Sequence, residues 1–492
     1  MKHLFSPFRI NGIKFKNRIV LPPLASFLIN KGGGITSETI EHYRRRAGGG
    51  PAMVIMEACA VSPEGIVSIN QARIDDDRMI EGLAAIATAI RSNGAIPAIQ
   101  IHHAGRHTPA KVIKRKPLAP SLLSCPTIRG EVEPLTANGI QALVDKFASA
   151  AVRAREAGFD LIEIHGAHGY LISQFLSRYS NIRSDGYGGT IAGRTRFAAE
   201  IVREIKNRLG ADYPISFKIS AQEFVPKGLT VDESIDILKI LVEAGIDVVQ
   251  VSAGNDATPE WICQPMFMKK ACLVDSAYQV KQALDIPVMA VGRINDPWTA
   301  DEIIADGKAD LVCIGRGLMA DPQMPNKAKA GRFDEIRTCI ACNTCMESIF
   351  RKGRLECLVN PYLGREEELR TERAEKPKKV MVIGGGNSAL EAALQISDEP
   401  GTTVTLSYRS NAFQKANPKN VVKVDEAAKA GKIQVIMTSS VLDINPKTVI
   451  IKQKDKEFEL GNDAVIICAG GILPTPMLKQ LGIQIETKYG TA

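Results

Sequence analysis

The chain has 492 residues, a net charge of +8, and the apolar and charged fractions of an ordinary globular protein, 45% and 24%. A length of this kind predicts about two to four domains. The basic residues are scattered, without a helical stripe or interleaved aromatic residues, so the charge fits a solvated basic surface or a preference for anionic ligands and does not indicate a nucleic-acid-binding protein.

Targeting segments are not predicted either. No uninterrupted apolar run is long enough to span a bilayer, so we expect no membrane anchor. The first residues, MKHLFSPFRINGIKFKNR, lack an apolar core followed by a small-residue cleavage site, so we expect no secretory signal and a cytoplasmic location. In that compartment the ten cysteines argue against a disulfide framework.

From residue 18 to about residue 320, short β-rich runs alternate with helical patterns. The expected strands are residues 18–24, 52–58, 96–103, 160–166, 215–220, 247–254, 287–293 and 310–316. Consecutive Val and Ile residues in these runs are typical of strands that are covered on both faces, as in parallel sheets. Eight such strands with helices between them predict an α/β fold of the (β/α)8 barrel type.

The ends of these strands are polar and rich in glycine, and that end of a barrel is where the chemistry of the fold is found. Turn chemistry explains the glycines of QIHHAGR and EIHGAHGY. It does not explain four histidines, His102, His103, His165 and His168, in only two loops. We therefore expect a functional site there, with His102 and His103 either contacting a ligand or holding their own loop.

A cluster of cysteines follows the eighth strand with the spacing C-x2-C-x2-C-x11-C. The four cysteines are Cys339, Cys342, Cys345 and Cys357. A compact triplet with one remote thiolate is typical of a [4Fe–4S] cluster, whereas zinc sites usually pair two separated knuckles. The spacing favours the iron–sulfur cluster and leaves zinc or incidental thiols as alternatives. The other six cysteines are dispersed, mostly in strand-like runs, as small core residues are.

A charged segment, GREEELRTERAEKPKK, leads to a second α/β region. Its start, KKVMVIGGGNSALEAALQI, predicts a strand, a tight turn and a helix, with Gly384, Gly386 and Ala389 in the pattern G-x-G-x-x-G/A. Such a turn either holds the pyrophosphate of a dinucleotide or is purely structural. The next strand is followed by Arg409 rather than an acid, which favours NADPH over NADH.

The string IEIHGAHGYLISQFLSRYSNIRSDGYGGT resembles the old yellow enzyme family of FMN oxidoreductases. With the cysteine cluster, the chain resembles the iron–sulfur subgroup that includes 2,4-dienoyl-CoA reductase, 2-enoate reductase and trimethylamine dehydrogenase. The likeness covers about residues 1 to 362. It implies an FMN-binding barrel over residues 1–335, a cluster segment over 336–363, a linker over 364–377 and a partial Rossmann-like NAD(P)-binding region over 378–492.

The resemblance also assigns roles. His165 and His168 match the pair that binds a substrate carbonyl oxygen, and Tyr170 matches the residue that protonates the substrate carbon. The positions that match flavin contacts are Pro23, Leu24, Ala25, Ala58, Gln100, Lys218, Gly292, Arg293, Gly315 and Arg316, the last four around the phosphate. The four clustered cysteines match the cluster ligands.

Two departures from the family bear on function. Lys218 stands where the family usually has arginine. Lysine keeps the positive charge near the flavin but lacks the planar guanidinium group that can donate two parallel hydrogen bonds. The loop ASFLIN has no cysteine, so the covalent flavin link of trimethylamine dehydrogenase is not expected, and that enzyme has tyrosine at the position of His165. The histidine pair therefore favours reduction of an enone, enoate or enoyl-CoA.

The C-terminal region is the largest departure. Relatives carry a FAD domain with an NAD(P)H domain inserted in it, and the residues after 378 resemble the inserted domain, so we expect the FAD lobe to be missing or supplied by another subunit. Three hypotheses follow: an ene reductase using NAD(P)H directly or through the cluster, an amine dehydrogenase serving an electron-transfer flavoprotein, or an electron-relay subunit of a larger complex. Whether the chain forms a homo-oligomer stays open.

Overall fold

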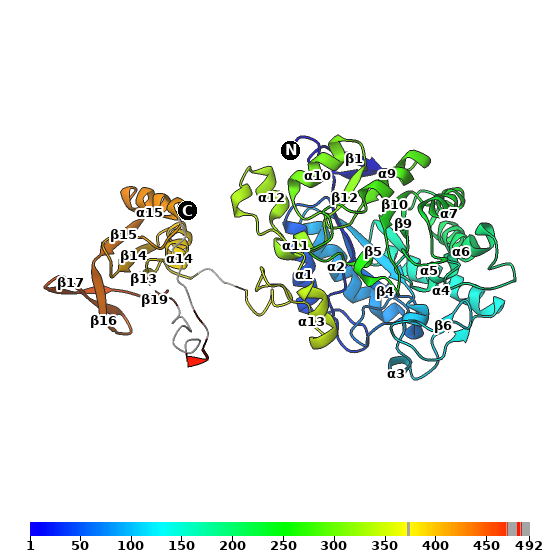
Figure 1. Cartoon of the computed structure of the whole chain (residues 1–492), viewed down its shortest axis with the longest axis horizontal. Coiled ribbons are helices and arrows are strands. Elements are labelled where there is room, and N and C mark those ends of the chain that lie inside the picture. The colour runs from blue at the N-terminus through cyan, green and yellow to red at the C-terminus, as the bar shows by residue number, and fades with distance from the viewer. Residues whose placement is uncertain (371–373, 469, 471–479, 483, 485–492) are drawn as a thin grey trace. The chain divides into compact units, whose positions relative to one another are not determined.

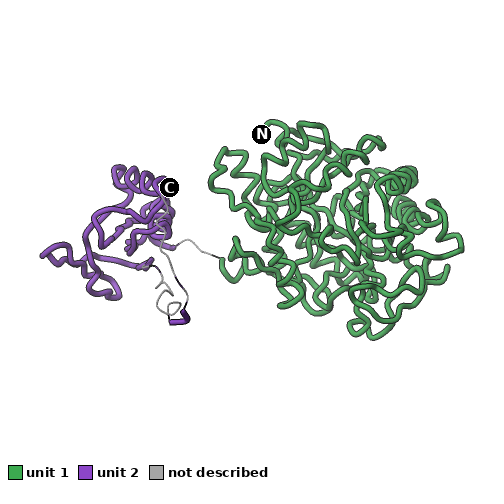
Figure 2. The backbone as a smooth tube through the Cα atoms, viewed as in Figure 1, with its two compact units in different colours: residues 1–370 green, residues 371–492 purple. Residues whose placement is uncertain are grey.

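The computed structural model describes residues 1–370, 374–468, 470, 480–482 and 484. The chain divides into two compact units, Met1–Arg370 and Thr371–Ala492 (Figure 2). In the described part, no helix combines the length and the apolar character needed to cross a bilayer.

Eight parallel strands form a closed barrel in the first unit (Figure 1), in the order β10-β11-β12-β3-β4-β5-β8-β9. They are β3 (Ile19–Leu21), β4 (Met53–Ala60), β5 (Ile96–His102), β8 (Leu161–Gly166), β9 (Ile215–Ser220), β10 (Val248–Ser252), β11 (Val288–Ala290) and β12 (Leu311–Cys313). Each lies within or overlaps one of the eight predicted runs, so the predicted barrel is confirmed. Consecutive residues of β8 to β12 are buried, as expected for strands covered on both faces.

Helices follow the strands and cover the outside of the barrel (Figure 1). They are α1 (Ser37–Gly48), α2 (Ile80–Ser92), α4 (Ala137–Glu156), α6 (Ile191–Leu209), α7 (Val231–Ala244), α9 (Val274–Ala283), α10 (Pro297–Ala305), α11 (Arg316–Ala320) and α12 (Met324–Lys329). A threonine side chain caps the start of α1, α4, α6 and α7 by accepting from a backbone N–H of the first turn. Short elements in the loops include α3 (Ala110–Ile113), β6 (Leu118–Ala119), β7 (Glu133–Pro134), α5 (Leu171–Leu176) and α8 (Pro259–Ile262).

A hairpin that the sequence analysis did not predict packs on the barrel core. It consists of β1 (Phe8–Ile10) and β2 (Ile13–Phe15), and its Ile10 and Phe15 are buried in one apolar cluster with residues of the barrel strands such as Met53, Met289 and Leu311. These partners lie toward the beginnings of their strands. The hairpin therefore fills that end of the barrel, and the opposite end, where the strands finish, is the one available for ligands.

The residues after the barrel stay attached to it. Helix α13 (Thr344–Lys352) contributes Ile349 to the main core, and Glu366 lies buried against α1. There the Glu366 carboxylate contacts Arg46 Nη2 at 2.8 Å and His42 Nδ1 at 3.5 Å. Burying this charge is tolerable only because it is paired. The segment up to Arg370 therefore belongs to the first unit.

The second unit contains a parallel sheet in the order β15-β14-β13-β19, formed by β13 (Lys379–Ile383), β14 (Thr403–Tyr408), β15 (Ile433–Met437) and β19 (Ala464–Ile467). Helices α14 (Asn387–Ser397) and α15 (Pro418–Lys429) connect its strands, which confirms a Rossmann-like arrangement. An antiparallel sheet of β16 (Ser439–Ile444), β17 (Thr448–Gln453) and β18 (Lys456–Gly461) precedes β19. Much of the predicted region after residue 468 lies outside the described residues.

Candidate active site

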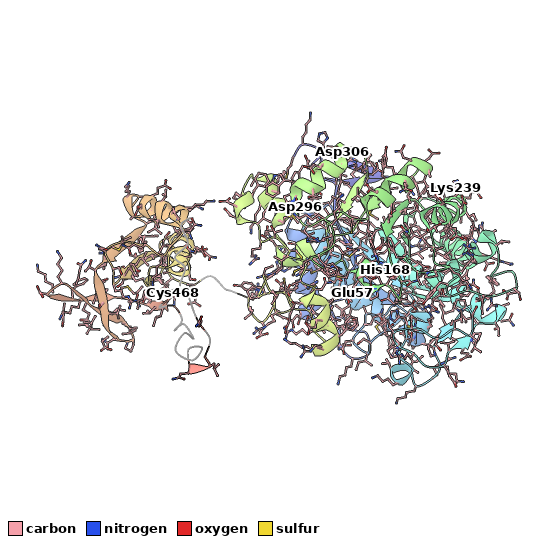
Figure 3. All side chains as sticks on the ribbon, viewed as in Figure 1. Glu57, His168, Lys239, Asp296, Asp306 and Cys468 are labelled. Carbon is pink, nitrogen blue, oxygen red and sulfur yellow. The ribbon has the colours of Figure 1, made fainter. Side chains whose placement is uncertain are left out.

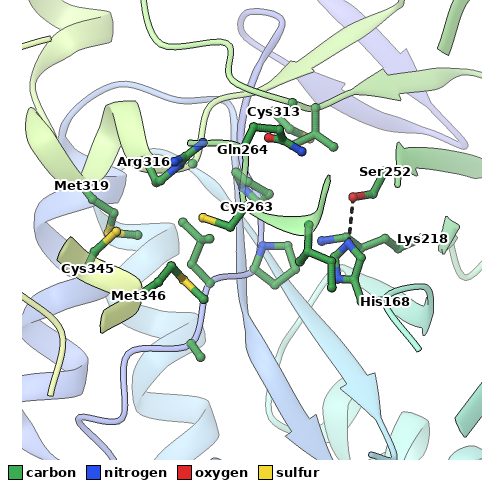
Figure 4. A pocket seen from close by; sticks show the side chains of 18 of the residues that line it. His168, Lys218, Ser252, Cys263, Gln264, Cys313, Arg316, Met319, Cys345 and Met346 are labelled. Carbon is green, nitrogen blue, oxygen red and sulfur yellow. Dashed lines mark hydrogen bonds between the residues drawn. The ribbon is translucent and has the colours of Figure 1, made fainter. Parts of the chain in front are cut away.

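A cavity of about 1200 Å³, counting the space at its open mouth, lies where the barrel strands end. His102 and His103, for which a ligand contact was one of two expectations, are not in its lining. The cavity is lined by every barrel residue to which the family resemblance gave a flavin or substrate contact: Pro23, Leu24, Ala25, Ala58, Gln100, His165, His168, Tyr170, Lys218, Gly292, Arg293, Gly315 and Arg316. Figure 4 shows part of this lining, with His168 and Lys218 on one side and Arg316 and Cys345 on another. The closed barrel thus brings together residues from both ends of a long stretch of sequence.

The apolar side of the cavity is the loop that follows β3. Pro22, Pro23, Leu24 and Ala25 line the cavity, and the next residue, Ser26, is fixed by the buried carboxylate of Glu57, which accepts from the Ser26 backbone N–H at 3.0 Å and from the Ser26 hydroxyl at 2.5 Å. The Tyr43 hydroxyl accepts from the Glu57 N–H and fixes the base of this arrangement. The loop gives the cavity an apolar side, called its floor below, which suits an aromatic ring.

A polar edge faces that floor. Lys218 of β9 is 6% exposed and pairs in register with His165 of β8, and the fully buried Glu163 of β8 is near enough for its charge to act on Lys218. Burial lowers the pKa of Lys218, and the Glu163 charge opposes this shift. The same carboxylate accepts from Gln100 Nε2 at 2.8 Å and from the Ser216 hydroxyl, so it fixes the orientation of the Gln100 amide. The cavity thus presents the Lys218 amine and an oriented amide at one edge.

His165 and His168 lie against each other with ring centroids 5.1 Å apart and ring planes at 80°. Burial, with the nearby charge of Lys218, lowers the pKa of both histidines well below 6.5, so both imidazoles are neutral at pH 7. The Ala167 N–H donates to His165 Nδ1 at 3.3 Å, which places the ring proton of His165 on Nε2. Nε2 of His165 is therefore the nitrogen that can donate to a ligand.

The other imidazole is fixed from two sides. His168 has a left-handed backbone, with φ of 65°, and its N–H donates to the Ser220 hydroxyl at 3.0 Å. Its Nε2 lies 2.8 Å from the Ser252 hydroxyl (Figure 4). When that hydroxyl donates to Nε2, the ring proton is on Nδ1, so His168 also offers one N–H donor.

Tyr170 stands beside this pair, with its ring centroid 4.9 Å from that of His165. Burial raises the pKa of Tyr170 to about 12, so its phenol carries a proton at neutral pH. The cavity is therefore bordered by two neutral imidazoles, His165 and His168, that can donate hydrogen bonds to an oxygen of a ligand. It is also bordered by the Tyr170 phenol, which can protonate a neighbouring atom.

The opposite end of the cavity is cationic. Arg293 follows β11 and Arg316 follows β12, and Gly292 and Gly315 come directly before them. The Arg293 Nε is buried and has no hydrogen-bond partner among the described residues, so it is available to an anion. A side chain at Gly292 would collide with Leu273, with a built Cβ only 2.7 Å from its Cγ. An apolar floor, a polar edge and a cationic end suit a ligand with a flat ring and an anionic tail.

A second, smaller cavity of about 330 Å³, including space open to solvent, is lined by all four clustered cysteines. None of the ten cysteines is in a disulfide. Among the described residues no three His, Cys, Asp or Glu side chains converge closely enough for one metal ion. The structure thus brings the four predicted ligands to the border of one space, while the choice between an iron–sulfur cluster and zinc rests on their spacing in the sequence.

The two cavities share a wall. Arg316, Met319 and Cys345 line both of them. Asn343, inside the cysteine segment, accepts a hydrogen bond from Arg316 Nη1 and donates through its Nδ2 to the Cys263 carbonyl at 2.8 Å. A group held by the cysteines would therefore lie next to a ligand in the barrel.

The predicted dinucleotide residues lie in the second unit. Gly384 has φ of 145° and directly follows β13, where a side chain would meet Cys468 O at 2.6 Å and Ala389 Cβ at 3.0 Å. Gly386 precedes α14, and a Cβ there would meet nothing within 4 Å. Arg409 follows β14 and is exposed. The glycine turn has the predicted strand–turn–helix context, while the ligand it would hold stays a prediction.

Several residues of the site were not predicted. They are Glu57, Glu163, Ser252, Cys263 and Asn343. Ser252 and Glu163 carried a signal, because a polar residue in an otherwise apolar barrel strand needs a partner across the sheet. Cys263 and Asn343 carried none, since the contact between them joins segments 80 residues apart.

Residues 3–335 match the model of the NADH:flavin oxidoreductase / NADH oxidase family. The chain belongs to that family. Residues 358–491 match the pyridine nucleotide-disulphide oxidoreductase model, so the predicted combination of a flavin barrel and a C-terminal nucleotide-binding fold is confirmed.

Relatives give the same picture. The chain is 45% identical to an NADH oxidase of Thermoanaerobacter brockii over 397 residues, which cover 80% of this chain and 61% of that protein. It is 32% identical to a cinnamate reductase of Clostridium sporogenes over 501 residues, covering 95% of this chain and 74% of that protein. A solved 2-naphthoyl-CoA reductase shares the fold, with a TM-score of 0.75 at 21% identity over 98% of this chain and 94% of that one. The chain thus spans about three fifths of the length of the NADH oxidase.

Proposed function

We propose that the protein is an ene reductase that reduces the C=C bond of an α,β-unsaturated carbonyl compound, such as an enoate, an enoyl-CoA or a cyclic enone. The observation that carries the proposal is the group of His165, His168 and Tyr170 at one wall of a cavity with an apolar floor. Membership in a flavin oxidoreductase family and the 32% identity to a cinnamate reductase support it.

The residues of the cavity fit FMN. Pro22, Pro23, Leu24, Ala25 and Ala58 would lie against its ring, Gln100 and Lys218 would contact the edge of the ring, and Arg293 and Arg316 would hold its phosphate. When bound, FMN supplies the hydride for the β-carbon of the alkene. The chain supplies the rest of the chemistry. Reduction of the alkene places negative charge on the carbonyl oxygen, and the N–H groups of His165 and His168 stabilise that charge.

Tyr170 completes the reaction by giving its phenol proton to the α-carbon. Because burial raises its pKa to about 12, the phenol does not lose this proton to water at neutral pH. Neutral imidazoles suit the site better than imidazolium ions would, since they donate hydrogen bonds without protonating the developing enolate prematurely.

Cys339, Cys342, Cys345 and Cys357 would hold a [4Fe–4S] cluster beside the flavin cavity. Electrons would come from NAD(P)H, directly or through this cluster, with Gly384, Gly386 and Ala389 of the second unit at the dinucleotide pyrophosphate and Arg409 at a ribose phosphate. A FAD-containing or electron-transfer protein is a second candidate source of these electrons.

The test is an anaerobic assay of the purified protein. Bound FMN, FAD, iron and sulfide are quantified first, and the flavin is then reduced by light. Mixing with cinnamate, an enoyl-CoA and a cyclic enone should reoxidise it with at least one alkene. If no alkene reoxidises the flavin, and an amine instead bleaches the oxidised form, the protein is an amine dehydrogenase and the proposal is wrong.

The cluster has its own test. Cys342→Ser should lower iron and sulfide content and remove the visible absorption of the cluster, whereas Cys468→Ser, in the second unit, should leave both unchanged (Figure 3). Binding of one zinc ion per chain without sulfide would overturn the assignment.

A further inference from the structure

His102 is a buried imidazole that the reaction described above does not use. It ends β5 and is 1% exposed, and neither of its ring nitrogens has a hydrogen-bond partner among the described residues. Burying both nitrogens of a histidine without partners is costly, and native structures rarely do so without a water or a function. His102 therefore calls for a role that packing does not provide.

Its neighbours suggest that role. The His102 ring meets Tyr170 edge-on, with centroids 4.7 Å apart and planes at 89°, and it lies 5.8 Å from the ring of His165. On another side of Tyr170 is the ring of His107, 5.5 Å away. The Nδ1 of His107 is also buried without a partner in the described part of the chain, and His107 itself is partly exposed. Two imidazoles thus flank the phenol, and one of them reaches toward solvent.

After each turnover of the proposed reaction, Tyr170 lacks the proton that the next turnover requires. Its O–H bond breaks and the proton goes to the substrate α-carbon, so a phenolate remains in a buried site. Burial favours the protonated phenol so strongly, with a pKa of about 12, that the phenolate must regain a proton before the next turnover. The cavity side of Tyr170 is occupied by flavin and substrate at that moment, so a proton source from behind the ring would be needed.

We propose that His102 and His107 form a proton relay that returns a proton to Tyr170 after each turnover. The proposal rests on the proposed function. One nitrogen of His102 gives its proton to the Tyr170 oxygen through a bound water, while the other nitrogen takes a proton from His107 or from a water beside it. His107 is recharged from solvent. One solvent proton therefore enters for each proton that leaves Tyr170. His102 ends neutral but with its proton on the other nitrogen, so rotation of the ring or proton exchange through the bound water restores the first tautomer before the next turnover.

A relay acts only after the first turnover, and this gives a sharp experiment. His102→Phe keeps the ring that packs on Tyr170 and removes both nitrogens. The photoreduced holoenzyme already holds the Tyr170 proton, so the variant should reoxidise its flavin in the first turnover within about two-fold of the unaltered rate. Later turnovers, with reductant in excess, should slow by about 100-fold, since general acid catalysis is worth about that much or more. Added imidazole should restore part of the rate.

A structural role for His102 predicts a different result. Misplacement of Tyr170 would slow the first and later turnovers alike, and equal slowing would overturn the relay. His103→Gln is the matched control, because His103 is a buried imidazole of the same loop whose Nδ1 accepts from the Gly105 N–H at 3.0 Å. It should change thermal stability but not the ratio of the first to later turnover rates.

Two further measurements separate a relay through His102 from a packing role of its ring. In a protein that already carries Tyr170→Phe, His102→Phe should not lower the rate of alkene reduction further, because both changes interrupt the same path of proton delivery. A crystal structure of the oxidised protein should show ordered water at the His102 nitrogens, and nitrogens packed only against carbon would contradict the proposal. If the unaltered protein reduces no alkene, the proposed function is wrong. If it reduces an alkene, but the first turnover of His102→Phe is not faster than its later turnovers, only the relay is wrong.

Discussion

The cavity of the barrel and the glycine turn of the second unit are both predicted ligand sites, but they are built in different ways. The predicted residues of the cavity come from the ends of many barrel strands, and buried carboxylates such as Glu57 and Glu163 hold them in place. The glycine turn is made by one strand, one turn and one helix. Its Gly386 faces open space, and Arg409 is exposed.

This difference shows where the specificity of each site resides. Several polar side chains at the cavity are paired with one another, as Gln100 is with Glu163 and His168 is with Ser252, and this pairing fixes their geometry before any ligand arrives. A glycine turn fixes only the path of the backbone and leaves the ligand to complete the site. Substitutions in the cavity should therefore change chemistry, whereas those in the turn should change only the supply of electrons.

The largest effect is expected for Tyr170→Phe. The phenol is the only assigned proton donor, so alkene reduction should fall by about 1000-fold, within the range for loss of a general acid. Reduction of the flavin by NAD(P)H should stay within about two-fold, because this half of the reaction does not use Tyr170. Stopped-flow absorbance of the flavin measures both halves. Equal losses in both would mean that the ring positions the flavin.

Gly386→Ala should produce the opposite pattern. The added methyl group meets no protein atom within 4 Å, and φ of −95° suits alanine, so the second unit should fold normally. The methyl group would occupy the space through which a pyrophosphate approaches the backbone, so NAD(P)H-driven flavin reduction should fall by about 100-fold. Reoxidation of photoreduced flavin by alkene should not change. Unaltered NAD(P)H kinetics would show that the turn is purely structural.

Much of the barrel fold and of the candidate site could be predicted from the sequence, because both produce local patterns in it. Each barrel strand lies in a short, mainly apolar run that ends in a polar or Gly-rich loop, so both the strands and the residues at their ends could be predicted. The predicted runs 18–24 and 287–293 exceed β3 and β11 because the chain leaves the barrel ladder before its apolar character ends. The β1–β2 hairpin was missed, since its alternation spans only three residues per strand.

The contacts that hold the site could not be predicted in the same way. Gln100 and Glu163 are 63 residues apart, and His168 and Ser252 are 84 apart, so each pairing depends on which strands become neighbours. The order of the strands follows from the closure of the barrel. Which side chains of neighbouring strands come to lie next to each other does not follow from it. The unpaired nitrogens of His102 belong to the same category, because whether a buried nitrogen finds a partner is a property of the packed interior.

Acid should destabilise the first unit more than the second. All seven histidines of the chain lie before residue 170, and burial lowers the pKa of His42 to about 4, of His102 to about 3 and of His103 to about 4. Unfolded histidine binds a proton below about pH 6.5, so between that value and the folded pKa the unfolded state holds more protons. Stability of the first unit should therefore fall as pH drops from 6.5, by roughly 2 kcal/mol per histidine at pH 5.

Calorimetry of the holoprotein at pH 7 and pH 5 would test this. The transition of the first unit should shift to lower temperature at pH 5. The second unit contains no histidine, so its transition should shift much less. Parallel shifts of both transitions would mean that carboxylates, rather than buried imidazoles, control the acid response.

The smallest effect concerns the tautomer of His168. Ser252→Ala removes the hydroxyl that lies 2.8 Å from Nε2 and leaves the ring free to place its proton on either nitrogen. Only the Nδ1–H form donates to the substrate oxygen in the proposed arrangement, so kcat/KM for the alkene should fall by about five-fold, or about 1 kcal/mol. The matched control is Ser234→Ala, which removes another buried hydroxyl, bonded to the Ala221 carbonyl outside the cavity. That variant should lose stability without losing activity, and an equal loss of activity in both would mean that Ser252 acts through packing and that the tautomer of His168 is fixed by the cavity as a whole.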